Sequence, residues 1–570
     1  MRIRVRIELR AYSTMQLSQK IWSAVQMVLI LAGVCSATGA AAQTSVYSAP
    51  LASQIMQQSQ QGIPNCSQGL LLKGMRAAWY NSANGALFTY EKNTLDKCMT
   101  LASTQAATGP QDSWNAGLLG GEFLRMYEIT RQPAYYNAAT SLDSQLTKDC
   151  TESSTSPCMA EPFLAAYATA FQHDADLGAI ADQFLRWQKD VQPSRKDSAA
   201  KQPAAISHAR FLAALADALP NFQHDKVDEQ RLLKAFRSEA DKWHPDNDTP
   251  LSAKLLHMYA VLKAVRFGYL PVEASNHAEG EWKKLIAQPL RPDAEDGALV
   301  LAATEMDLAK SAALGRGQTV LVDAWFNSQQ RTNAAGQREY FHYKWNDYSD
   351  SGDSLLGHIF RGDGVNTDAL YSAPTQANLA QAQYYVIVSP DNPAKNPTPH
   401  YMTAQDADEV AAWVGKGGVL VMLENDPPNA DIAHLNLLAD KFGIHFDDVL
   451  HHHIVNDKVR GDHIEDGTIH LPGGGPVFHD PHTIYLKDTC AITLSGSAQS
   501  LLNDRGDVVM ATVRYGKGMV FAMVDPWAYN EYTDGRKNHA IYGQFDNFAA
   551  ATELVRWLVE QHNALASAEN

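Results

Sequence analysis

The chain has 570 residues, more than one hydrophobic core supports, so at least two domains are expected. Hydrophobic residues make up 45% of the sequence and charged residues 19%, which is typical of globular proteins and excludes a disordered chain. The net charge of -16 argues against a nucleic-acid partner and against binding to an anionic membrane surface.

Residues 1–43 are predicted to be an export signal. Several arginines precede the apolar run VQMVLILAGV, and the small residues SATGAAAQ follow it. A membrane anchor is the alternative, but the run is short for crossing a bilayer, and no later segment approaches the necessary length. We therefore expect an exported protein, periplasmic or extracellular, with no membrane span in the mature chain.

Five cysteines follow the signal: Cys66, Cys98, Cys150, Cys158 and Cys490. In an oxidising compartment Cys150 can pair with Cys158 and Cys66 with Cys98, although spacing alone does not determine connectivity. Neither C-x-x-C nor H-E-x-x-H occurs, so a zinc site has no local support.

Residues 44–315 are predicted to form a helical domain. Segments such as NAGLLGGEFLRMYEIT, HARFLAALADAL and PLSAKLLHMYAVLKAV carry apolar residues at i, i+3, i+4 and i+7. Such helices, joined by short turns, must bury their apolar stripes against one another. A toroid of helical hairpins and a helical solenoid both satisfy this requirement.

Residues 316–570 are predicted to alternate strands and helices. YYVIVSP and GVLVMLEND have the pattern of buried strands, and AQDADEVAAWVGKG, HLNLLADKFG and FDNFAAATELVRWLVEQH have the pattern of helices. Apolar strands separated by helices predict a parallel sheet covered on both faces. VVMATVRYGKGMVFAMVD adds a predicted hairpin that turns at GKG.

Three polar loops, at 388–392, 423–436 and 524–536, follow apolar strands, so parallel strands would place them on one edge of the sheet, where ligands bind. The segment HYKWNDYSDSG at 342–352 is expected to join them. The aromatic rings of Trp345 and Trp527 are candidates for stacking on a sugar. The hydrogen-bonding candidates for the same ligand are Asp347, Asn425, His434, Asp525, Asn530, Glu531, Asp534 and Arg536. The alternative is that these groups satisfy one another, pin long loops or face the helical domain.

Two further motifs carry less weight. An imidazole-rich segment comprises His451, His452, His453, His463, His479 and His482. A surface cluster in a variable loop is favoured there over a metal site. GKGG at 415–418 resembles a phosphate loop only superficially, because it ends a predicted helix whereas a phosphate loop begins one.

In the helical half, Asp112 stands in QDSWNAGLL at the start of a predicted helix, with Trp114 and Asn115 beside it. These three residues are candidates for catalysis and substrate binding. Asp is also a favoured N-cap residue, so Asp112 has a structural explanation as well.

The helical half contains QDSWNAGLLGGEFLRMYEITRQPAYYNAA, CMAEPFLAAYA, PLSAKLLHMYAVLKAVRFGYLP and EDGALVLAATEMD. Through these segments, most of residues 60–310 resemble the unsaturated glucuronyl and rhamnogalacturonyl hydrolases, glycoside hydrolase families 88 and 105. The C-terminal half contains YVIVSPD, GGVLVMLEND, LADKFGIHF and VDPWAYNEYTDGRK. It resembles a flavodoxin-like or amidotransferase-like module that is appended to some of these hydrolases.

The resemblance implies a multidomain α plus α/β fold, with an N-terminal (α/α)6 barrel followed by a flavodoxin-like parallel α/β sandwich. It implies an enzyme that removes unsaturated uronic acid from rhamnogalacturonan-type oligosaccharides. In that chemistry an acidic side chain protonates the C4=C5 bond and helps water add at C5, and the resulting hemiketal opens. No metal or organic cofactor is implied. One carboxyl group serves as acid and then as base if its surroundings raise its pKa.

By the same resemblance, Asp112 falls on the first of the family's two active-site aspartates. The second precedes M-x-x-P-F by four residues, where this chain has Thr155, which cannot exchange a proton at neutral pH. Glu152 and Glu161 are possible substitutes, but a shift of three or more residues moves the carboxyl group away from its target. The family's W-x-R-x-x-G-W segment is also absent, and KQPAAISHARF stands in its place.

Three hypotheses follow. The first is an exported hydrolase of unsaturated uronides that uses Asp112 and a second acid not identified by its motif. The second is a catalytically degenerate scaffold or carbohydrate-binding protein whose ligand site lies in the C-terminal α/β domain. The third is an enzyme whose active site has moved to the polar loops of that domain.

Overall fold

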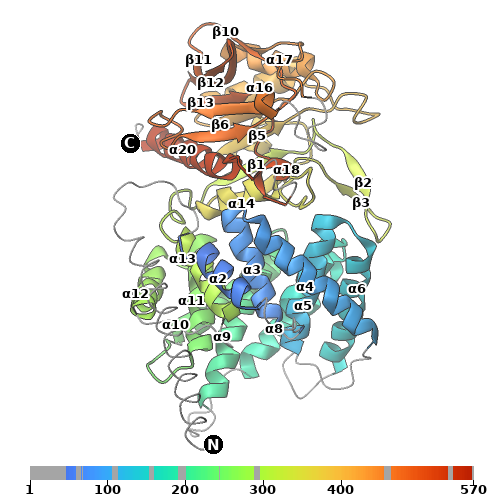
Figure 1. The fold of residues 1–570 in the computed structure, drawn as a ribbon, viewed down its shortest axis with the longest axis vertical. Coiled ribbons are helices and arrows are strands. Elements are labelled where there is room, and N and C mark those ends of the chain that lie inside the picture. Colours follow the sequence, from blue (N-terminus) through green and yellow to red (C-terminus); the bar gives the residue numbers. More distant parts are fainter. Residues whose placement is uncertain are drawn as a thin grey trace, which may run out of the picture.

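The computed structural model describes residues 46–59, 66, 68–104, 113–152, 159–190, 201–242, 244–287, 296–454, 464–536 and 543–567. The predicted export signal lies outside these residues. Figure 1 shows a helical domain formed by the first half of the chain and an α/β domain stacked on one end of it. The connection between the two includes residue 315, the predicted boundary.

The helical domain contains α2 (Ser48–Ser59), α3 (Gly69–Ser82), α4 (Gly85–Thr104), α5 (Ser113–Thr130), α6 (Pro133–Glu152), α7 (Glu161–Ala170), α8 (Leu177–Asp190), α9 (Lys201–Ala218), α10 (Lys226–Lys242), α11 (Leu251–Arg266), α12 (Ser275–Ile286) and α13 (Asp296–Leu308). Within the described residues, α3, α5, α7, α9, α11 and α13 each pack on the next, and α13 packs on α3. These helices therefore close a ring, and the helices between them lie outside it.

Small residues allow the ring helices to approach closely. A Cβ atom on Gly117 of α5 would lie 2.7 Å from the Cα of Ala160, just before α7. One on Gly297 of α13 would lie 2.5 Å from the backbone of Leu70 in α3. Ring helices such as α11 bury residues around most of their surface, whereas the outer helix α10 buries one stripe. The predicted toroid of helices is thus explained by glycine positions as well as by apolar periodicity.

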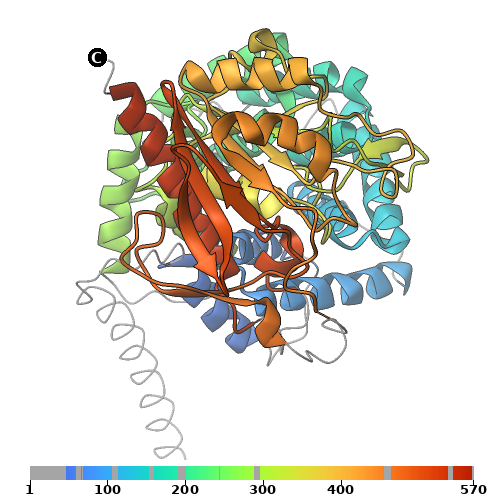
Figure 2. The same ribbon diagram turned by 90° about the horizontal axis from the view of Figure 1, so that it is seen from above.

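The α/β domain contains β1 (Thr319–Asp323), β2 (Gln330–Thr332), β3 (Arg338–Tyr340), α14 (Ser354–Gly362), β4 (Asn366–Leu370), α15 (Gln376–Leu379), β5 (Tyr384–Val388), α16 (Ala404–Gly415), β6 (Val419–Leu423), α17 (Ile432–Ala439), β7 (Ile444–Phe446), β8 (Thr468–Leu471), β9 (His482–Tyr485), β10 (Ile492–Leu494), β11 (Gln499–Asp504), β12 (Asp507–Tyr515), β13 (Gly518–Met523), α18 (Asn530–Thr533) and α20 (Asn547–Ser567). Viewed from above, α16 and α17 lie on one face of the sheet and α20 on the other (Figure 2).

The main sheet has the order β4-β1-β5-β6-β13-β12-β10-β7, with β11 paired to β12. Neighbours from β4 to β13 pair in parallel, and those from β13 to β7 pair antiparallel. The predicted parallel sheet is therefore found in one half, and the other half extends the predicted hairpin with further antiparallel strands. The predicted hairpin at GKG is confirmed by the pairing of Tyr515 with Gly518, and a two-residue turn joins only antiparallel strands.

The α/β domain docks on the C-terminal ends of the ring helices. The indole Nε1 of Trp79, in the last turn of α3, donates a hydrogen bond to the carbonyl oxygen of Asp534 at 2.6 Å. Next to it, Nε2 of His358 lies 2.7 Å from Oδ1 of Asn81. The guanidinium of Arg536 lies over the Trp79 ring, 5.7 Å from its centre.

The β2–β3 hairpin makes a second set of contacts with the helical domain (Figure 1). Arg131, directly after α5, forms an ion pair with Glu339 at 2.6 Å. The backbone N–H of Ala334 donates to the hydroxyl of Tyr127 at 2.7 Å. Both sets of contacts lie at the C-terminal ends of ring helices.

Two glycines face each other across the first contact. A Cβ atom on Gly85 would lie 1.9 Å from the carbonyl oxygen of Gly535. One on Gly535, whose φ of +71° also favours glycine, would lie 2.0 Å from the carbonyl oxygen of Ala83. The close approach of the two backbones requires glycine on both sides.

Gly85→Ala is expected to destabilise the protein by roughly 1–3 kcal/mol, because the added methyl group meets backbone that cannot yield without separating the domains. Urea denaturation followed by tryptophan fluorescence measures the effect. Gly121→Ala on α5 is the matched control, since its Cβ would meet nothing within 4 Å. The control should be neutral or stabilising by about 0.5–1 kcal/mol. Equal stability of the two variants would contradict this description of the interface.

Candidate functional site

The loops predicted to share one edge of the sheet do so. β5, β6 and β13 pair in parallel, which brings their carboxyl ends, and the segments 388–392, 423–436 and 524–536 after them, to the same edge. The side chains of these loops have different roles, however, and most are already engaged within the protein.

The two tryptophans predicted to stack on a sugar are core residues. Trp345 is 6% exposed, and its Nε1 donates to the carbonyl oxygen of Asp368 at 2.9 Å. Trp527 is 0% exposed. The expectation of an open stacking surface is therefore corrected, because apolar packing covers both indoles.

Asp347 and Asn530 hold the loop between β3 and α14. Asp347 is buried and accepts hydrogen bonds from Nη2 of Arg331 at 3.0 Å and from the N–H of Ser349 at 3.1 Å. Nδ2 of Asn530 donates to the carbonyl oxygen of Ser349 at 2.8 Å, and its Oδ1 accepts from the N–H of Leu355 at 3.1 Å. Both side chains satisfy backbone groups that would otherwise be buried without partners.

Asp534 and Arg536 belong to the domain interface. They form an ion pair with each other, and Arg536 also lies 3.4 Å from Asp350. Burial raises the pKa of Asp534 to about 6, although the Arg536 charge acts in the opposite direction. Nearby, Glu531 accepts a hydrogen bond from the hydroxyl of Tyr529 at 2.9 Å. The sequence left open whether these residues bind a ligand or face the helical domain, and the contacts of Asp534 and Arg536 are those of a domain interface.

Asn425 and His434 lie apart from that interface. Nδ2 of Asn425 donates to the hydroxyl of Tyr343 and to Oγ of Ser389, both at 3.3 Å. His434, half-exposed on α17, places Nδ1 2.7 Å from Oδ2 of Asp431. Its ring stacks on Tyr401 with 4.3 Å between centres. A role of these residues in ligand binding stays a prediction.

Two carboxyl groups at this edge are buried and have unused hydrogen-bonding capacity. Glu424, directly after β6, is 0% exposed, and Asp525, two residues after β13, is 4% exposed. Oε2 of Glu424 and Oδ1 of Asp525 have no hydrogen-bond partner. Burial raises the pKa of both groups well above the usual range. Burial thus favours the protonated form of both groups, and a protonated carboxyl group can donate a hydrogen bond.

The first turns of α5 and α7 lie together at the other end of the ring from the α/β domain. The N–H of Met159 donates to Oγ of Ser113, the first residue of α5, at 3.3 Å. Asp112 and Thr155, the positions expected to carry the family's carboxylates, lie outside the described residues. This end of the ring is therefore described through the neighbouring residues, from Ser113 in α5 and from Met159 before α7.

Glu161, the first residue of α7, is the unusual group there. It is 0% exposed, and neither of its carboxyl oxygens has a hydrogen-bond partner. Burial raises its pKa to about 8, against the opposing effects of its own backbone N–H and of the Arg186 charge. Glu161 is thus protonated at neutral pH, with a pKa close to the range in which a side chain gives up and regains a proton efficiently.

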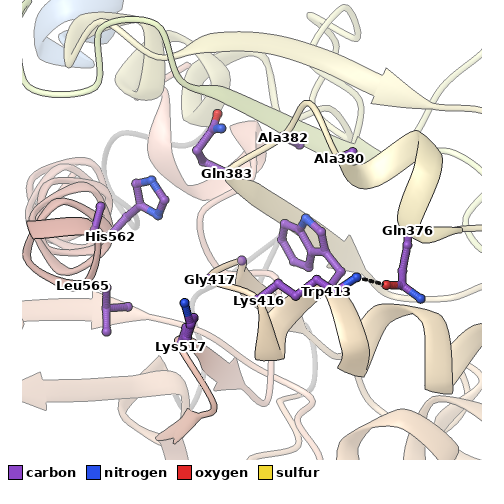
Figure 3. Close-up of a pocket in the computed structure, with 12 residues that line it drawn as sticks. Gln376, Ala380, Ala382, Gln383, Trp413, Lys416, Gly417, Lys517, His562 and Leu565 are labelled. Atoms are coloured by element: carbon purple, nitrogen blue, oxygen red, sulfur yellow. Dashed lines mark hydrogen bonds between the residues drawn. The ribbon is translucent and has the colours of Figure 1, made fainter. Parts of the chain in front are cut away.

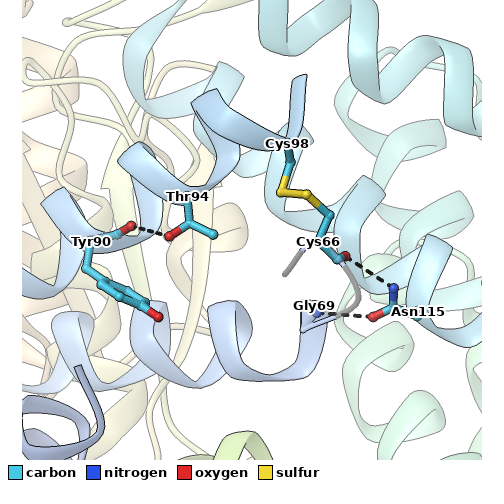
Figure 4. The surroundings of a disulfide bond; sticks show 6 residues. All are labelled: Cys66, Gly69, Tyr90, Thr94, Cys98 and Asn115. Atoms are coloured by element: carbon cyan, nitrogen blue, oxygen red, sulfur yellow. Dashed lines mark hydrogen bonds between the residues drawn. A yellow bond between two sulfur atoms is a disulfide. The ribbon is translucent and has the colours of Figure 1, made fainter. Parts of the chain in front are cut away.

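Trp114 and Asn115 lie beside this end. Trp114 is 5% exposed, with the guanidinium of Arg210 5.3 Å from its ring centre. Oδ1 of Asn115 accepts from the N–H of Gly69 at 3.1 Å, and its Nδ2 donates to the carbonyl oxygen of Cys66 at 3.4 Å (Figure 4). Asn115 therefore fixes the start of α3, and its role in substrate binding stays a prediction.

Cys66 forms a disulfide with Cys98, with 5.6 Å between Cα atoms, as one of the predicted pairings had it (Figure 4). Cys150 is also disulfide-bonded, and Cys158 lies outside the described residues. Cys490 is a free, buried thiol. The disulfide ties the start of α3 to α4 at the same end of the ring as Glu161.

Several histidines of the imidazole-rich segment lie beside carboxylates, while His463 lies outside the described residues. His451 lies 3.1 Å from Asp447 and 2.9 Å from Asp507, and His453 lies 2.8 Å from Asp488. Among the residues that the structure describes, no group of three or more histidine, cysteine, aspartate or glutamate side chains is arranged to hold a metal ion. No helix in the described ranges is long and apolar enough to cross a membrane.

Sequence reasoning named Glu161 only as a possible substitute for the family's second carboxylate, and it assigned no role to Glu424. Glu161 stands where an acidic residue is ordinarily an exposed partner of the helix N-terminus, so its burial has no sequence signal. Glu424 directly follows five apolar residues of β6, and an acid that ends such a buried run was an available signal.

No family model matches the chain, and no curated protein matches it. A solved structure described as the mmIFT52 N-terminal domain is 10% identical with a TM-score of 0.30, covering 43% of this chain and 97% of its own. The cytoplasmic protein STM3548 from Salmonella typhimurium is 14% identical with a TM-score of 0.27, covering 43% and 98%. The exo-beta-1,4-mannosidase Op5Man5 from Opitutaceae bacterium strain TAV5 is 12% identical with a TM-score of 0.26, covering 64% and 55%. These similarities are too weak to assign a fold family or an activity.

The burial of Glu161 has a consequence for stability. Because its pKa is raised from 4.5 to about 8, the folded state keeps a proton that the unfolded state loses over that interval. Stability should therefore fall as pH rises from about 4.5 to about 8, by a few kcal/mol in total. Glu161→Gln should remove this loss, so the free energy of unfolding of the variant should increase relative to that of the wild type as pH rises. Urea unfolding at pH 5 and pH 8 tests this, and parallel pH profiles for the two proteins would show that Glu161 is not held as a neutral acid.

Proposed function

We propose that the chain is an exported glycosidase that acts on unsaturated uronides, with Glu161 as its proton donor. The observation that carries this proposal is the buried, unpartnered carboxyl group of Glu161, with a pKa of about 8, at the end of the ring where the family resemblance expects the active site. The closed ring of alternating inner and outer helices supports the (α/α)6 barrel that the same resemblance implies.

The proposed reaction uses one carboxyl group twice. Neutral Glu161 transfers its proton to the C4=C5 double bond of the uronic acid, and water adds at C5. The resulting carboxylate of Glu161 accepts the proton that the water releases, which restores the neutral acid. The hemiketal formed at C5 then opens and the sugar is released. Asp112 is proposed as the second carboxylate, which orients the water.

The arrangement of the domains supports this location. Trp79, Arg131 and Phe171, at the C-terminal ends of α3, α5 and α7, all contact the α/β domain. The opposite end of the ring, where Glu161 lies, is free of those contacts. Arg186 and Arg210 supply positive charge near Glu161 and Trp114, as the carboxylate of a uronic acid requires.

Export to the periplasm or the exterior is part of the proposal. The Cys66–Cys98 disulfide supports it, because structural disulfides persist mainly in oxidising compartments. The proposed ligand is an oligosaccharide that ends in an unsaturated uronic acid.

Purified mature protein should remove the ultraviolet absorbance of the double bond in unsaturated rhamnogalacturonan or chondroitin disaccharides. Glu161→Gln should lower kcat by roughly 10²-fold or more, because the amide has no proton to transfer. Asp143→Asn is the matched control. Asp143 also has a pKa raised by burial, to about 6, but lies on the outer helix α6. Activity that survives in Glu161→Gln would remove Glu161 from the reaction.

The pH dependence of the rate gives an independent test. The wild-type rate should decline as pH rises through about 8, because ionised Glu161 has no proton to give. The pH profile of kcat/KM measures this ionisation in the free enzyme. A rate that stays constant from pH 7 to pH 9 would point to a different proton donor.

A second candidate is carbohydrate binding without catalysis in the α/β domain. The unpartnered carboxyl groups of Glu424 and Asp525 at the carboxyl edge of the sheet favour it. If the protein shows no hydrolase activity, measurements of saccharide binding to variants distinguish the two candidates. Saccharide affinity that Asp525→Asn weakens and Glu161→Gln leaves unchanged would support binding in the α/β domain.

A further inference from the structure

A cavity of about 360 Å³ lies at the amino edge of the sheet, opposite the edge that carries Glu424 and Asp525. It is bounded by the end of α16, the turn between β12 and β13, and the last turns of α20 (Figure 3). The residues that line it are Gln376, Ala380, Ala382, Gln383, Trp413, Lys416, Gly417, Gly418, Lys517, His562, Leu565 and Ala566.

Two Gly-Lys-Gly segments, about 100 residues apart in the sequence, meet at this cavity. The backbone N–H of Lys517 donates to the carbonyl oxygen of Gly415 at 3.0 Å, and that of Met519 donates to the carbonyl oxygen of Gly418 at 3.2 Å. The two turns therefore form one rigid unit. Each contributes a lysine, Lys416 or Lys517, to the same cavity wall.

Glycine is required where the two turns touch. A Cβ atom on Gly516 would lie 2.6 Å from the carbonyl oxygen of Gly415, and one on Gly518 would lie 2.2 Å from that of Gly418. The φ of Gly417, +120°, is also unfavourable for other residues. The glycines thus set the close spacing of the backbones from which the two lysines project.

The polar groups of the wall are the lysine and glutamine side chains and the ring of His562, whose pKa is lowered by burial, and none of the residues that line the cavity is acidic. Nζ of Lys416 donates to Oε1 of Gln376, which leaves the amide NH₂ of that glutamine available. Oε1 of Gln383 accepts from the N–H of Thr319 at 2.8 Å, so its NH₂ group is available too. On a chain with a net charge of -16, such a wall is selective for negative charge.

The remaining wall is apolar. The indole of Trp413 packs directly on Gly418, where a Cβ atom would lie 2.5 Å from the ring. Leu565 lines the side formed by α20. A wall with donors on one side and an indole on another suits a small organic anion that has a ring or an apolar part.

Side chains, and not a helix N-terminus, must hold such an anion. α16 ends at this cavity, and the C-terminal end of a helix carries partial negative charge. The site therefore differs from a phosphate loop, in which backbone N–H groups at a helix start bind the ligand. Lys416 and Lys517 are the groups that can outweigh the helix end.

We propose that this cavity binds a small anion that carries a carboxylate or phosphate group, held by Lys416 and Lys517 and packed against Trp413. The proposal does not depend on Glu161 or on glycosidase activity, because the cavity and the end of the ring belong to different domains.

Isothermal titration calorimetry of the full mature chain at low salt tests this, with inorganic phosphate and glucuronate as separate probes. At least one probe should bind, and Lys416→Gln/Lys517→Gln should weaken its affinity at least tenfold. The control Lys283→Gln/Lys310→Gln makes the same change in net charge at exposed lysines of the helical domain and should retain binding. The probe that binds identifies phosphate or carboxylate as the preferred group.

Two results would overturn the proposal: no binding of either probe to the wild type, or equal weakening in both double variants, which would indicate a general effect of charge. Circular dichroism confirms that each variant is folded. If the double variant is unfolded, Lys517→Gln, which lies on an exposed turn, is tested alone. The site would also be rejected if this single variant bound the probe with wild-type affinity.

Discussion

The docking of the α/β domain on the C-terminal ends of the ring helices is the constraint on which the rest of the structure depends. Its centre is the approach of Gly535 to the turn at Ala83 and Gly85, where no side chain fits on either backbone. Trp79 and Arg536 close over this point through one hydrogen bond and one stacked contact. Since these groups are buried, the contact combines apolar burial with satisfied polar groups, as stable interfaces require.

This docking determines which polar residues are used to join the domains and which lie away from the interface. Asp534, Arg536 and the neighbouring loop residues that look like a ligand site in the sequence are used to join the domains. The start of α7, by contrast, lies at the end of the ring that the α/β domain does not touch. The same division places the carboxyl edge of the sheet and its amino edge in different surroundings, so each can have a separate role.

Much of the fold followed from local patterns in the sequence. Helical periodicity predicted the ring helices, and the apolar runs of β5 and β6 predicted buried parallel strands. The antiparallel strands beyond the predicted hairpin were missed because β7, β10 and β11 are short or half-exposed, so neither length nor alternation marks their direction.

The candidate site was predicted less well, for a physical reason. The sequence around a tryptophan such as Trp527 does not distinguish an indole that is buried in a core from one that stacks on a sugar. The side chain of Arg536 is buried because a second domain docks there, and the local sequence does not indicate that docking. Glu161 shows the converse error, because a residue at a helix start is expected to be exposed and here is buried.

The buried acids of the protein divide into those with a charged partner and those without one. Within the helical domain, Glu122, Asp217 and Glu305 are matched by Arg76, Lys263 and Arg266. Such pairing offsets the cost of removing a charge from water.

Glu161 has no such partner, and neither do the unbonded oxygens of Glu424 and Asp525. A buried carboxyl group without a partner costs stability unless it stays protonated, and a protonated carboxyl group can donate its hydrogen. Glu91, on α4 of the same domain, is also buried with neither carboxyl oxygen hydrogen-bonded, so the lack of a partner does not by itself mark a functional site. Glu161 differs from Glu91 in its position, because it begins α7 at the end of the ring that the α/β domain does not touch, where the proposed reaction requires a carboxyl group that can release its proton.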